Sequence, residues 1–443
     1  LYDKYYKHFY WRVKMGSNRN KNKKKKKSKI NRKNLTIVLA ALVVFLVAIV
    51  AGVKSFNKGD NVAKVNKTTE LTQSQNNETY SASLIACGDV MAHSPQLDAQ
   101  YNLSTKQYSF ENNYKYVKEY VQKADLAIAN LETTLAGNDV YNYSSYPTFN
   151  TPDSLADALK DTGFDLLSTI NNHSFDMSSL GVERTLSTLK SKGFDTVGTR
   201  QKTSDDDYII ENVNNIKLGI TSYTYGEIKN GTKYLNGIKV SSDKTDLMNV
   251  FDTSDVNKAF DTIYSTVKKY QDDTDMQIVI IHWGDEYSRT PNDFQKKLAQ
   301  KLCDAGVDII IGSHPHVVEP VETIKSTDGK NETLVIYSLG NYISNQRREY
   351  ISMYTEDGLM VDINIEKQGN NEAKVKKVTC IPTWVNKYES SGKSVYEIIP
   401  VADNILEKTT YIDQSYLKQS YKNTSELIKT DDKISIVKSP FEN

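Results

Sequence analysis

The chain has six histidines, and five of them follow short apolar runs that predict buried strands. The run 307–311 leads into Gly312 and then into two histidines, His314 and His316, with a single proline between them. The other three of this set are His93, His173 and His282. Neutral imidazole is a ligand for Zn, Fe, Mn and Cu, so this pattern predicts a transition-metal site.

Carboxylate and amide side chains occur at the same places along the chain, namely Asp89, Asn130, Glu132 and Asn172. A dinuclear centre needs about this set of groups: one bridging carboxylate, several imidazoles and an amide oxygen. Two ions about 3.5–4 Å apart can clamp a substrate oxyanion and generate a hydroxide nucleophile. The chemistry would then be hydrolysis or group transfer at phosphorus or carbon.

Each of these residues has an ordinary structural alternative. Asp89 is typical of a turn or a helix cap, and Glu132 could cap the loop that follows it. His282, which precedes Trp283, could be a packed core histidine. Because five separate strand ends carry such groups, we interpret them together as one metal site.

The elements that would position these residues alternate between strands and helices, which predicts an α/β domain with at least partly parallel sheets. Strands are expected at 83–87, 125–129, 164–170, 276–281, 307–311 and 333–339. Helices are expected at 111–123, 151–163, 178–192, 255–270 and 292–305. Open α/β sheets bind ligands at the carboxyl ends of their strands, which is where the candidate ligands stand.

Other stretches carry weaker signals. Thr151 and Pro152 are typical of an N-cap and a first helical residue. The polar stretch 225–253 is expected to form a long loop or insertion. Residues 358–366 and 373–380 alternate like exposed antiparallel strands. The last residues are polar and predict either a short appended helix or a loose tail.

The amino-terminal part predicts a membrane anchor. Residues 12–33 are strongly basic without any acid, and residues 35–53 are apolar and uncharged. Such a stretch can cross a bilayer as a helix, and the positive-inside bias puts the amino terminus in the cytoplasm. A cleaved signal peptide is the alternative, but its apolar core would be shorter and a small-x-small site should follow. The expected divisions are 1–34 (basic cytoplasmic segment), 35–53 (transmembrane anchor), 54–80 (flexible linker), 81–400 (folded domain) and 401–443 (C-terminal extension).

The composition indicates the cellular compartment of the protein and limits its possible partners. A basic run alone could indicate nucleic acid, but the apolar stretch directly behind it favours the membrane instead. The three cysteines, Cys87, Cys303 and Cys380, are too few and odd in number for a disulfide framework. We therefore expect buried thiols, no nucleic-acid partner and an extracellular main domain on a single-pass anchor.

Six ordered motifs resemble the CapA family of capsule and poly-γ-glutamate biosynthesis proteins, which is related to calcineurin-like metallophosphatases. They are Cys87-Gly-Asp-Val-Met, Asn130-Leu-Glu132, Asn171-Asn-His173, His282-Trp-Gly-Asp-Glu-Tyr287, Gly312-Ser-His-Pro-His316 and Ser338-Leu-Gly-Asn-Tyr-Ile343. The resemblance covers about 81–400 and is specific as an ordered set. It implies a four-layer αββα sandwich, in which two sheets lie between outer helices.

The resemblance also implies roles for individual residues. Glu132 would lie between two divalent ions drawn from Mn, Fe or Zn, or beside a single one. The other ligands would be Asp89, His93 and His316 on one ion and Asn172, His282 and His314 on the other. His173 would act as a general acid oriented by Asp176. Substrate contacts would come from Asn130, Glu286, Arg289 and Asn341.

This chain departs from the phosphatase pattern, as its family does. In the first motif Asp89 and His93 stand four residues apart rather than two. The second motif has Asn-x-Glu in place of Gly-Asp with a further Asp, and the third lacks the Gly and the following acid. The fold and at least one metal are compatible with these changes, but phosphatase activity does not follow from them.

We therefore expect a membrane-anchored extracellular protein of capsule-type polymer biosynthesis, with poly-γ-glutamate as the polymer. It would act in polymerisation, export or retention of the chain. Its partners would be the anionic polymer, the membrane and, as a further candidate, membrane subunits of a polymer synthase. Two alternatives stay open: a cell-surface metal-dependent hydrolase of phosphoesters or amides, and a non-catalytic polymer-binding scaffold.

Overall fold

The computed structural model describes residues 78–402 and 404–441. The predicted basic segment and transmembrane anchor lie outside these residues, as does nearly all of the predicted linker. Within the described part of the chain, no helix is long and apolar enough to cross a membrane. The first strand, β1 (Thr79–Val90), begins close to the predicted start of the folded domain at Ser81.

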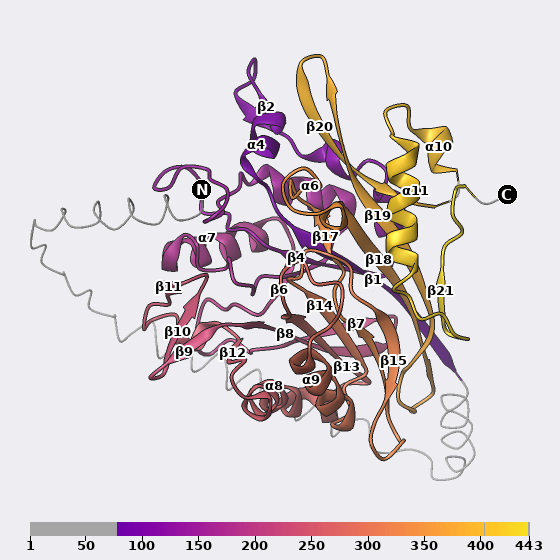
Figure 1. Cartoon of the computed structure of the whole chain (residues 1–443). Coiled ribbons are helices and arrows are strands. Elements are labelled where there is room, and N and C mark those ends of the chain that lie inside the picture. Colours follow the sequence, from indigo (N-terminus) through magenta and orange to yellow (C-terminus); the bar gives the residue numbers. More distant parts are fainter. Residues whose placement is uncertain (1–77, 403, 442–443) are drawn as a thin grey trace, which may run out of the picture. The chain divides into compact units, whose positions relative to one another are not determined.

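Two large sheets form the centre of the described part (Figure 1). The first has the strand order β20 (Lys393–Pro400), β19 (Lys374–Ser390), β18 (Asp357–Gln368), β1, β4 (Leu126–Leu131), β5 (Leu166–Ser168) and β6 (Asp195–Val197). In addition, β17 (Asn341–Ile343) pairs with β1, and β21 (Ile434–Ile436) pairs with β19. The neighbours from β1 to β6 are parallel, whereas β18, β19 and β20 are antiparallel.

The second sheet has the order β12 (Val250–Phe251), β8 (Ile216–Tyr225), β13 (Met276–His282), β14 (Ile309–Ser313), β16 (Glu332–Ile336) and β15 (Val321–Lys325), with β7 (Ile209–Val213) beside β8. The neighbours from β12 to β16 are parallel, and β15 and β7 are antiparallel additions. The prediction of an α/β domain with partly parallel sheets is therefore confirmed.

Helices cover the outer faces of both sheets. The helices that pack on the first sheet are α4 (Ser94–Gln100), α5 (Lys118–Val121), α6 (Ser154–Thr162) and α7 (Ser178–Ser191). Those on the second sheet are α8 (Val256–Tyr270) and α9 (Asp293–Asp304). Another apolar cluster is made of side chains from both sheets and fills the space between their inner faces. Helix, sheet, sheet and helix thus follow one another as layers.

The central strands of the second sheet show why these runs are strands. Ile278 and Ile280 of β13 belong to the cluster between the sheets, whereas Val279 and Ile281 pack toward the outer helices. Successive side chains of a strand point to opposite faces, so a strand buried on both faces needs an unbroken apolar run. The β-branched run that ends at His282 satisfies this requirement.

The stretch 225–253 was expected to form a long loop or an insertion, and the first of these alternatives is wrong. This stretch forms a small antiparallel sheet of β9 (Glu227–Lys229), β10 (Thr232–Leu235) and β11 (Ile238–Lys239), followed by β12. The two hairpin turns contain Asn230-Gly231 and Asn236-Gly237, all four with positive φ, which is typical of two-residue hairpin turns. Buried Leu235 then packs the small sheet against the main domain.

Two predicted helices differ from the structure. The range 111–123 contains only a 3-10 turn (Glu111–Tyr114) and the short α5 rather than one continuous helix. Within the turn, the buried side chain of Asn113 donates to the carbonyl of Tyr396 at 2.6 Å. Helix α6 begins after Asp153 rather than at Thr151. The Thr151 hydroxyl lies 2.7 Å from that of Thr133 and is engaged there.

The C-terminal residues complete the first sheet. Strand β18 is largely buried rather than exposed over the predicted range 358–366, because its residues face the cluster between the sheets on one side and further apolar groups on the other. Strand β19 mixes exposed and buried residues up to Cys380 and is buried in the residues that follow. Both strands are antiparallel, as predicted. Helix α11 (Gln414–Ser425) lies against them in Figure 1, after the short α10 (Ile405–Lys408). The residues beyond Pro400 thus include an appended helix, which was one of the two expectations.

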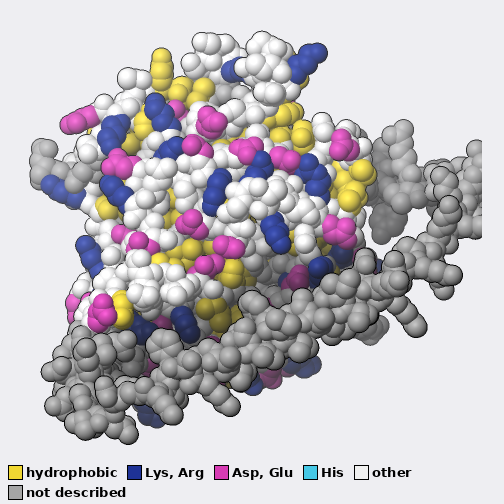
Figure 2. Space-filling model, turned by 180° about the vertical axis from the view of Figure 1, so that it is seen from behind, with side chains coloured by type: hydrophobic (Ala, Val, Ile, Leu, Met, Phe, Trp, Pro, Cys, Tyr) yellow, Lys and Arg dark blue, Asp and Glu magenta, His cyan; other side chains and the backbone are white. Residues whose placement is uncertain are grey.

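The surface seen in Figure 2 carries Lys and Arg side chains interspersed with Asp and Glu. Neither sign of charge gathers over a large area of this face. Surface charge therefore does not mark a binding site on this face of the molecule.

Candidate metal centre

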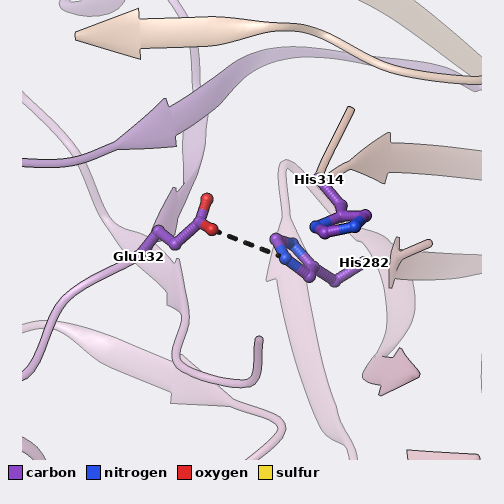
Figure 3. A group of neighbouring side chains, drawn as sticks. All are labelled: Glu132, His282 and His314. Carbon is purple, nitrogen blue, oxygen red and sulfur yellow. Dashed lines mark ion pairs between the residues drawn. The ribbon is translucent and has the colours of Figure 1, made fainter. Parts of the chain in front are cut away.

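Parallel pairing brings the predicted ligands together at one edge of each sheet. In the first sheet Asp89 of β1 is paired with Asn130 of β4, and in the second His282 of β13 is paired with Ser313 of β14. The two edges meet, because Glu132 Oε1 lies 3.6 Å from His282 Nε2. Figure 3 shows the Glu132 carboxylate directed at His282, with the His314 ring beside it.

Two glycines permit the close backbone contacts behind these ligands. A Cβ atom at Gly88 would lie 2.0 Å from the carbonyl oxygen of Gly340, and one at Gly312 would lie 1.9 Å from that of Tyr337. Neither distance is possible for a side chain, so only glycine allows the strand ends to approach this closely. The glycines of the first and fifth motifs therefore shape the site.

Among residues 78–402 and 404–441, three groups of side chains are close enough to hold metal ions, with donor atoms within 4.8 Å of one another in each group. The groups are Glu132 with His282 and His314, Asp89 with Glu132 and His316, and Glu286 with His314 and His316. Glu132 belongs to two of them. This is the arrangement expected of a carboxylate that lies between two ions.

Glu132 is fully buried, and neither of its carboxylate oxygens has a hydrogen-bond partner within the described residues. Burial raises the pKa of Glu132 well above its usual range, and the negative charges of Asp89 and Glu286 raise it further. A buried carboxylate without a partner is costly unless a cation compensates it. The donor set therefore fits a divalent metal ion.

The histidines have the protonation state that a metal ligand needs. Burial lowers the pKa of His282 and His314 well below the usual range, and the neighbouring imidazoles lower it further. Both rings are therefore neutral near pH 7. The Nδ1 atom of His314 has no hydrogen-bond partner among the described residues, which leaves it available as a donor to a metal.

Other side chains fix the orientation of these rings. His282 Nε2 lies 2.9 Å from Asn172 Oδ1, so the donor atoms of these two predicted ligands are adjacent. His282 Nδ1 lies 2.9 Å from Ser313 Oγ, and His316 Nδ1 lies 3.1 Å from Asn341 Oδ1. Contacts of this kind orient metal-binding imidazoles and tune their basicity.

Asn130 and Asn341 lie behind the ligands and are buried. The Asn130 amide donates to Asp89 Oδ1 at 2.7 Å and accepts from Asn171 at 3.2 Å. The Asn341 amide donates to the backbone carbonyl of His316 at 3.2 Å. The structure therefore places both predicted substrate contacts against ligand residues, where they hold Asp89 and His316 in position.

His93 lies beside the three groups but in none of them. It is the N-cap of α4, and its Nδ1 accepts the backbone N–H of Asn345 at 3.2 Å. Burial lowers its pKa to about 4, and its ring packs edge-on against Phe149. The same Phe149 ring contacts His173, so it separates the two histidines.

His173 and Asp176 form a buried pair next to the ligands. His173 Nδ1 lies 2.7 Å from Asp176 Oδ2, which also accepts the backbone N–H of Phe149 at 2.6 Å. The side chain of Asn236, at the turn between β10 and β11, donates to Asp176 Oδ1 at 3.2 Å. The predicted acid and its orienting carboxylate therefore come together, and the inserted small sheet supports them.

The two remaining predicted residues lie on the loop after β13. Glu286 is exposed, yet its carboxylate reaches the donor atoms of His314 and His316. The Arg289 side chain donates to the backbone carbonyl of Asn423 in α11 and lies 4.1 Å from the centre of the Tyr354 ring. Arg289 is therefore directed at the C-terminal helix.

Sequence reasoning missed three residues at this site. Tyr225 stacks on His282 at a ring distance of 6.2 Å and contacts His314 at 4.7 Å, while Ser313 and Asn236 make the contacts described above. Ser313 could have been found from the Gly-Ser-His-Pro-His motif. Tyr225 and Asn236 lie in the polar insertion, where the sequence carries no comparable signal.

The family of the chain follows from a match over most of this domain. Residues 83–346 match the model of the family described as bacterial capsule synthesis protein PGA_cap. The chain belongs to this family. The match to PGA_cap includes every candidate ligand from Asp89 to His316, whereas α11 lies beyond it.

The chain is also similar, at low sequence identity, to two curated proteins and to a solved structure. The PGA biosynthesis protein CapA of Bacillus subtilis is 27% identical over 313 residues, which cover 70% of this chain and 74% of that protein. The capsule biosynthesis protein CapA of Bacillus anthracis is 24% identical over 347 residues, covering 77% and 74% respectively. The solved structure of the NAD nucleotidase NadN of Haemophilus influenzae has a TM-score of 0.42 at 13% identity, covering 82% of this chain and 65% of that one.

Proposed function

We propose that this chain is a membrane-anchored extracellular protein that takes part in the polymerisation, export or retention of a capsule-type polymer, poly-γ-glutamate. Membership of the PGA_cap family and the similarity to two CapA proteins support the polymer and the process. The basic run followed by the apolar stretch 35–53 supports the anchor and its orientation. The anionic polymer, the membrane and membrane subunits of a polymer synthase are the proposed partners.

We further propose that the domain is a four-layer αββα sandwich of the calcineurin-like metallophosphatase type and holds one or two divalent ions of Mn, Fe or Zn. The observation that carries this proposal is the buried Glu132 carboxylate, which has no hydrogen-bond partner in the described chain and faces the imidazoles of two strand ends. Asp89, His282, His314 and His316 complete the donor set in the groups described above. Asn172 adds an amide oxygen.

A bound ion would supply a positive charge that polarises a substrate oxygen and lowers the pKa of bound water. The chain's own residues do the rest. Glu132 lies between the two edges of the site, and the rings of Tyr225 and Phe149 pack against His282 and His173. His173 is positioned by Asp176 to give or take a proton at the ring nitrogen that the carboxylate does not engage.

A cell-surface metal-dependent hydrolase of phosphoesters or amides is the second candidate function. The buried His173 and Asp176 pair favours it, since a scaffold would have no need of an oriented proton-transfer group. The two candidates share the metal centre and differ in whether the domain helps to make, export or retain the polymer or cleaves a phosphoester or amide bond. A non-catalytic polymer-binding role requires neither the ions nor this pair.

The experiment that tests the proposal replaces Glu132 by Gln in the cellular gene and in the purified full-length chain. An amide cannot bridge two ions as a carboxylate does, so the variant should lose most of its bound metal. Surface poly-γ-glutamate should fall with it, at an unchanged amount of anchored protein. Glu407→Gln, which removes one exposed carboxylate from α10, is the matched control and should retain both.

Normal polymer in cells whose Glu132→Gln protein has lost its metal would contradict a metal-dependent role and leave the scaffold function. Wild-type protein without bound Mn, Fe or Zn, after growth with all three, would contradict the metal centre itself. Loss of polymer together with loss of the folded domain would be recognised from the protein's thermal melt. In that case His282→Ala and His314→Ala, each of which removes only one ligand, give the same test.

A further inference from the structure

The group of Glu286, His314 and His316 differs from the other two donor groups because its carboxylate belongs to an exposed residue. Glu132 and Asp89 are fully buried, whereas Glu286 lies on the exposed loop that follows β13. Its carboxylate nevertheless stands within 4.8 Å of a donor atom of His314 and of one of His316. These two histidines belong one to each of the buried groups, so Glu286 faces both halves of the centre.

The backbone that presents these three side chains is strained. His314 has φ 101°, His316 has φ 57° and Tyr287, next to Glu286, has φ 66°. Residues with a Cβ rarely adopt this left-handed region, and an aromatic residue does so least readily. Such strain persists only where the surrounding structure enforces it, and it gathers at ligand-binding sites.

A backbone hydrogen bond joins the two strained segments. The backbone N–H of Tyr287 donates to the carbonyl of Pro315, the residue between the two histidines, at 2.8 Å. The Tyr287 ring lies 6.2 Å from that of His316. The conformation of the loop that carries Glu286 is therefore coupled directly to that of the His314–His316 segment.

The loop is also held at both of its ends. Gly284 has φ 90°, and a Cβ there would lie 2.8 Å from the Gln295 side chain, so the chain can turn tightly after β13 only at a glycine. At the other end Arg289 is bound to the carbonyl of Asn423 and packs over Tyr354. Glu286 is consequently presented by a fixed loop.

The charges around Glu286 call for a cation. Glu286 and Glu132 each have a carboxylate oxygen within 4.8 Å of a donor atom of His314 and of one of His316. Two carboxylates that converge on the same imidazoles repel each other in a site of low dielectric. A positive ion between them removes this repulsion.

We propose that Glu286 is a metal ligand, which closes the solvent side of the centre together with His314 and His316. This inference rests on the proposed metal-binding function and assigns Glu286 to the ion rather than to the substrate. Because Glu286 is exposed while the other carboxylates are buried, it is the ligand that exchanges most readily with solvent. The ion class is the same divalent transition metal that imidazole and carboxylate donors select.

The test uses the full-length chain in detergent, stripped of metal and titrated with Mn²⁺. Glu286→Gln should raise the dissociation constant for Mn²⁺ at least about tenfold, since even groups that only support a ligand cost about 10–100-fold. In the Co²⁺-loaded protein the same variant should change the visible absorption bands, which report the donor atoms directly. Glu286→Asp, which keeps a carboxylate, should recover part of both effects.

The matched control is Glu407→Gln, which removes an equal charge from an exposed position on α10 and should match the wild type in both measurements. Wild-type affinity and an unchanged Co²⁺ spectrum in Glu286→Gln would overturn the inference while leaving the metal centre standing. A wild-type chain that binds neither ion would overturn the centre as well. The two failures are therefore distinguishable.

Discussion

The imidazole of His173 and the carboxylate of Asp176 face each other, with His173 Nδ1 2.7 Å from Asp176 Oδ2. Both side chains are buried, and Asp176 is held by the N–H of Phe149 and the amide of Asn236. An ionised carboxylate only accepts hydrogen bonds, so the proton between them resides on Nδ1. The other ring nitrogen, Nε2, is then the atom that can exchange a proton with a substrate.

If His173 transfers a proton, His173→Ala should retain both the fold and the bound metal. The loss of a positioned acid or base lowers a rate by about 10²–10⁴-fold. We therefore expect cells with this variant to lose most of their surface polymer, or the purified chain most of its hydrolytic activity, at normal protein abundance. Polymer content, metal content and a thermal melt of the same preparation check this.

His8→Ala is the matched control, because His8 lies in the basic amino-terminal segment, and it should change nothing. Full polymer in the His173→Ala strain would remove the proton-transfer role. If Glu132→Gln also left the polymer unchanged, only the binding role would remain.

Asn236 is predicted to act through Asp176. Asn236→Ala removes the donor to Asp176 Oδ1 and the 2.7 Å bond to the carbonyl of Pro147. A hydrogen bond to a charged group contributes about 1.5 kcal/mol or more, so activity should fall about tenfold with metal content unchanged. The control Lys239→Ala, an exposed residue of the same small sheet, should keep wild-type activity. An Asn236→Ala chain with undiminished activity would show that the inserted sheet does not support the pair.

Asp357 predicts a pH dependence of stability away from the metal centre. This buried residue of β18 accepts a hydrogen bond from Asn423 of α11 at 2.8 Å, and burial raises its pKa to about 7. The folded chain therefore binds this proton more tightly than the unfolded chain does. The resulting stability is fully present below about pH 4 and is lost as the pH rises through about 7.

Asp357→Asn removes that titration. The unfolding free energy of the wild type, measured against this variant by urea denaturation, should therefore fall between about pH 4 and pH 7 and then level off. Asp432→Asn changes an exposed carboxylate and serves as the control. A difference between wild type and Asp357→Asn that stays constant over this range would show that Asp357 is ionised throughout.

The proposed topology predicts the outcome of proteolysis on intact cells. Added protease should remove the large domain and leave a short basic fragment in the membrane, since residues 12–33 are expected on the cytoplasmic side. Cells opened before treatment should lose the basic fragment too. Protection of the domain in intact cells would reverse the topology, and a soluble domain that begins just after Val53 would instead indicate signal cleavage.

Local sequence patterns were sufficient for the buried strands and for two of the outer helices. The β-branched runs before His282 and His314 are needed wherever a strand is covered on both faces, so they identify parallel central strands without knowledge of the fold. The helices predicted at 255–270 and 292–305 are present as α8 and α9, and their N-caps in the structure are Asp255 and Asn292. These parts of the prediction are confirmed.

Patterns failed where a distant partner decided the outcome. Thr151 has the chemistry of an N-cap, but its hydroxyl is engaged by Thr133. The helical pattern at 111–123 begins instead with a 3-10 turn, where the Asn113 side chain reaches the carbonyl of Tyr396. The insertion 225–253 is polar and yet forms a sheet, since Leu235 finds an apolar surface on the main domain. Each of these contacts joins residues that are well separated in the sequence, so a local pattern cannot reveal it.

The sequence by itself determined that His, Asp, Glu and Asn residues stand at the strand ends, and these residue types predict a metal centre. Only the tertiary structure decided which of them converge: Glu132 faces His282, His93 lies outside the donor groups, and Glu286 reaches the histidines from an exposed loop. The physical reason is that strand character depends on local burial patterns, whereas convergence depends on how two sheets pack and which backbone segments are held in strained conformations. Those relationships arise between residues far apart in the chain, so no local pattern contains them.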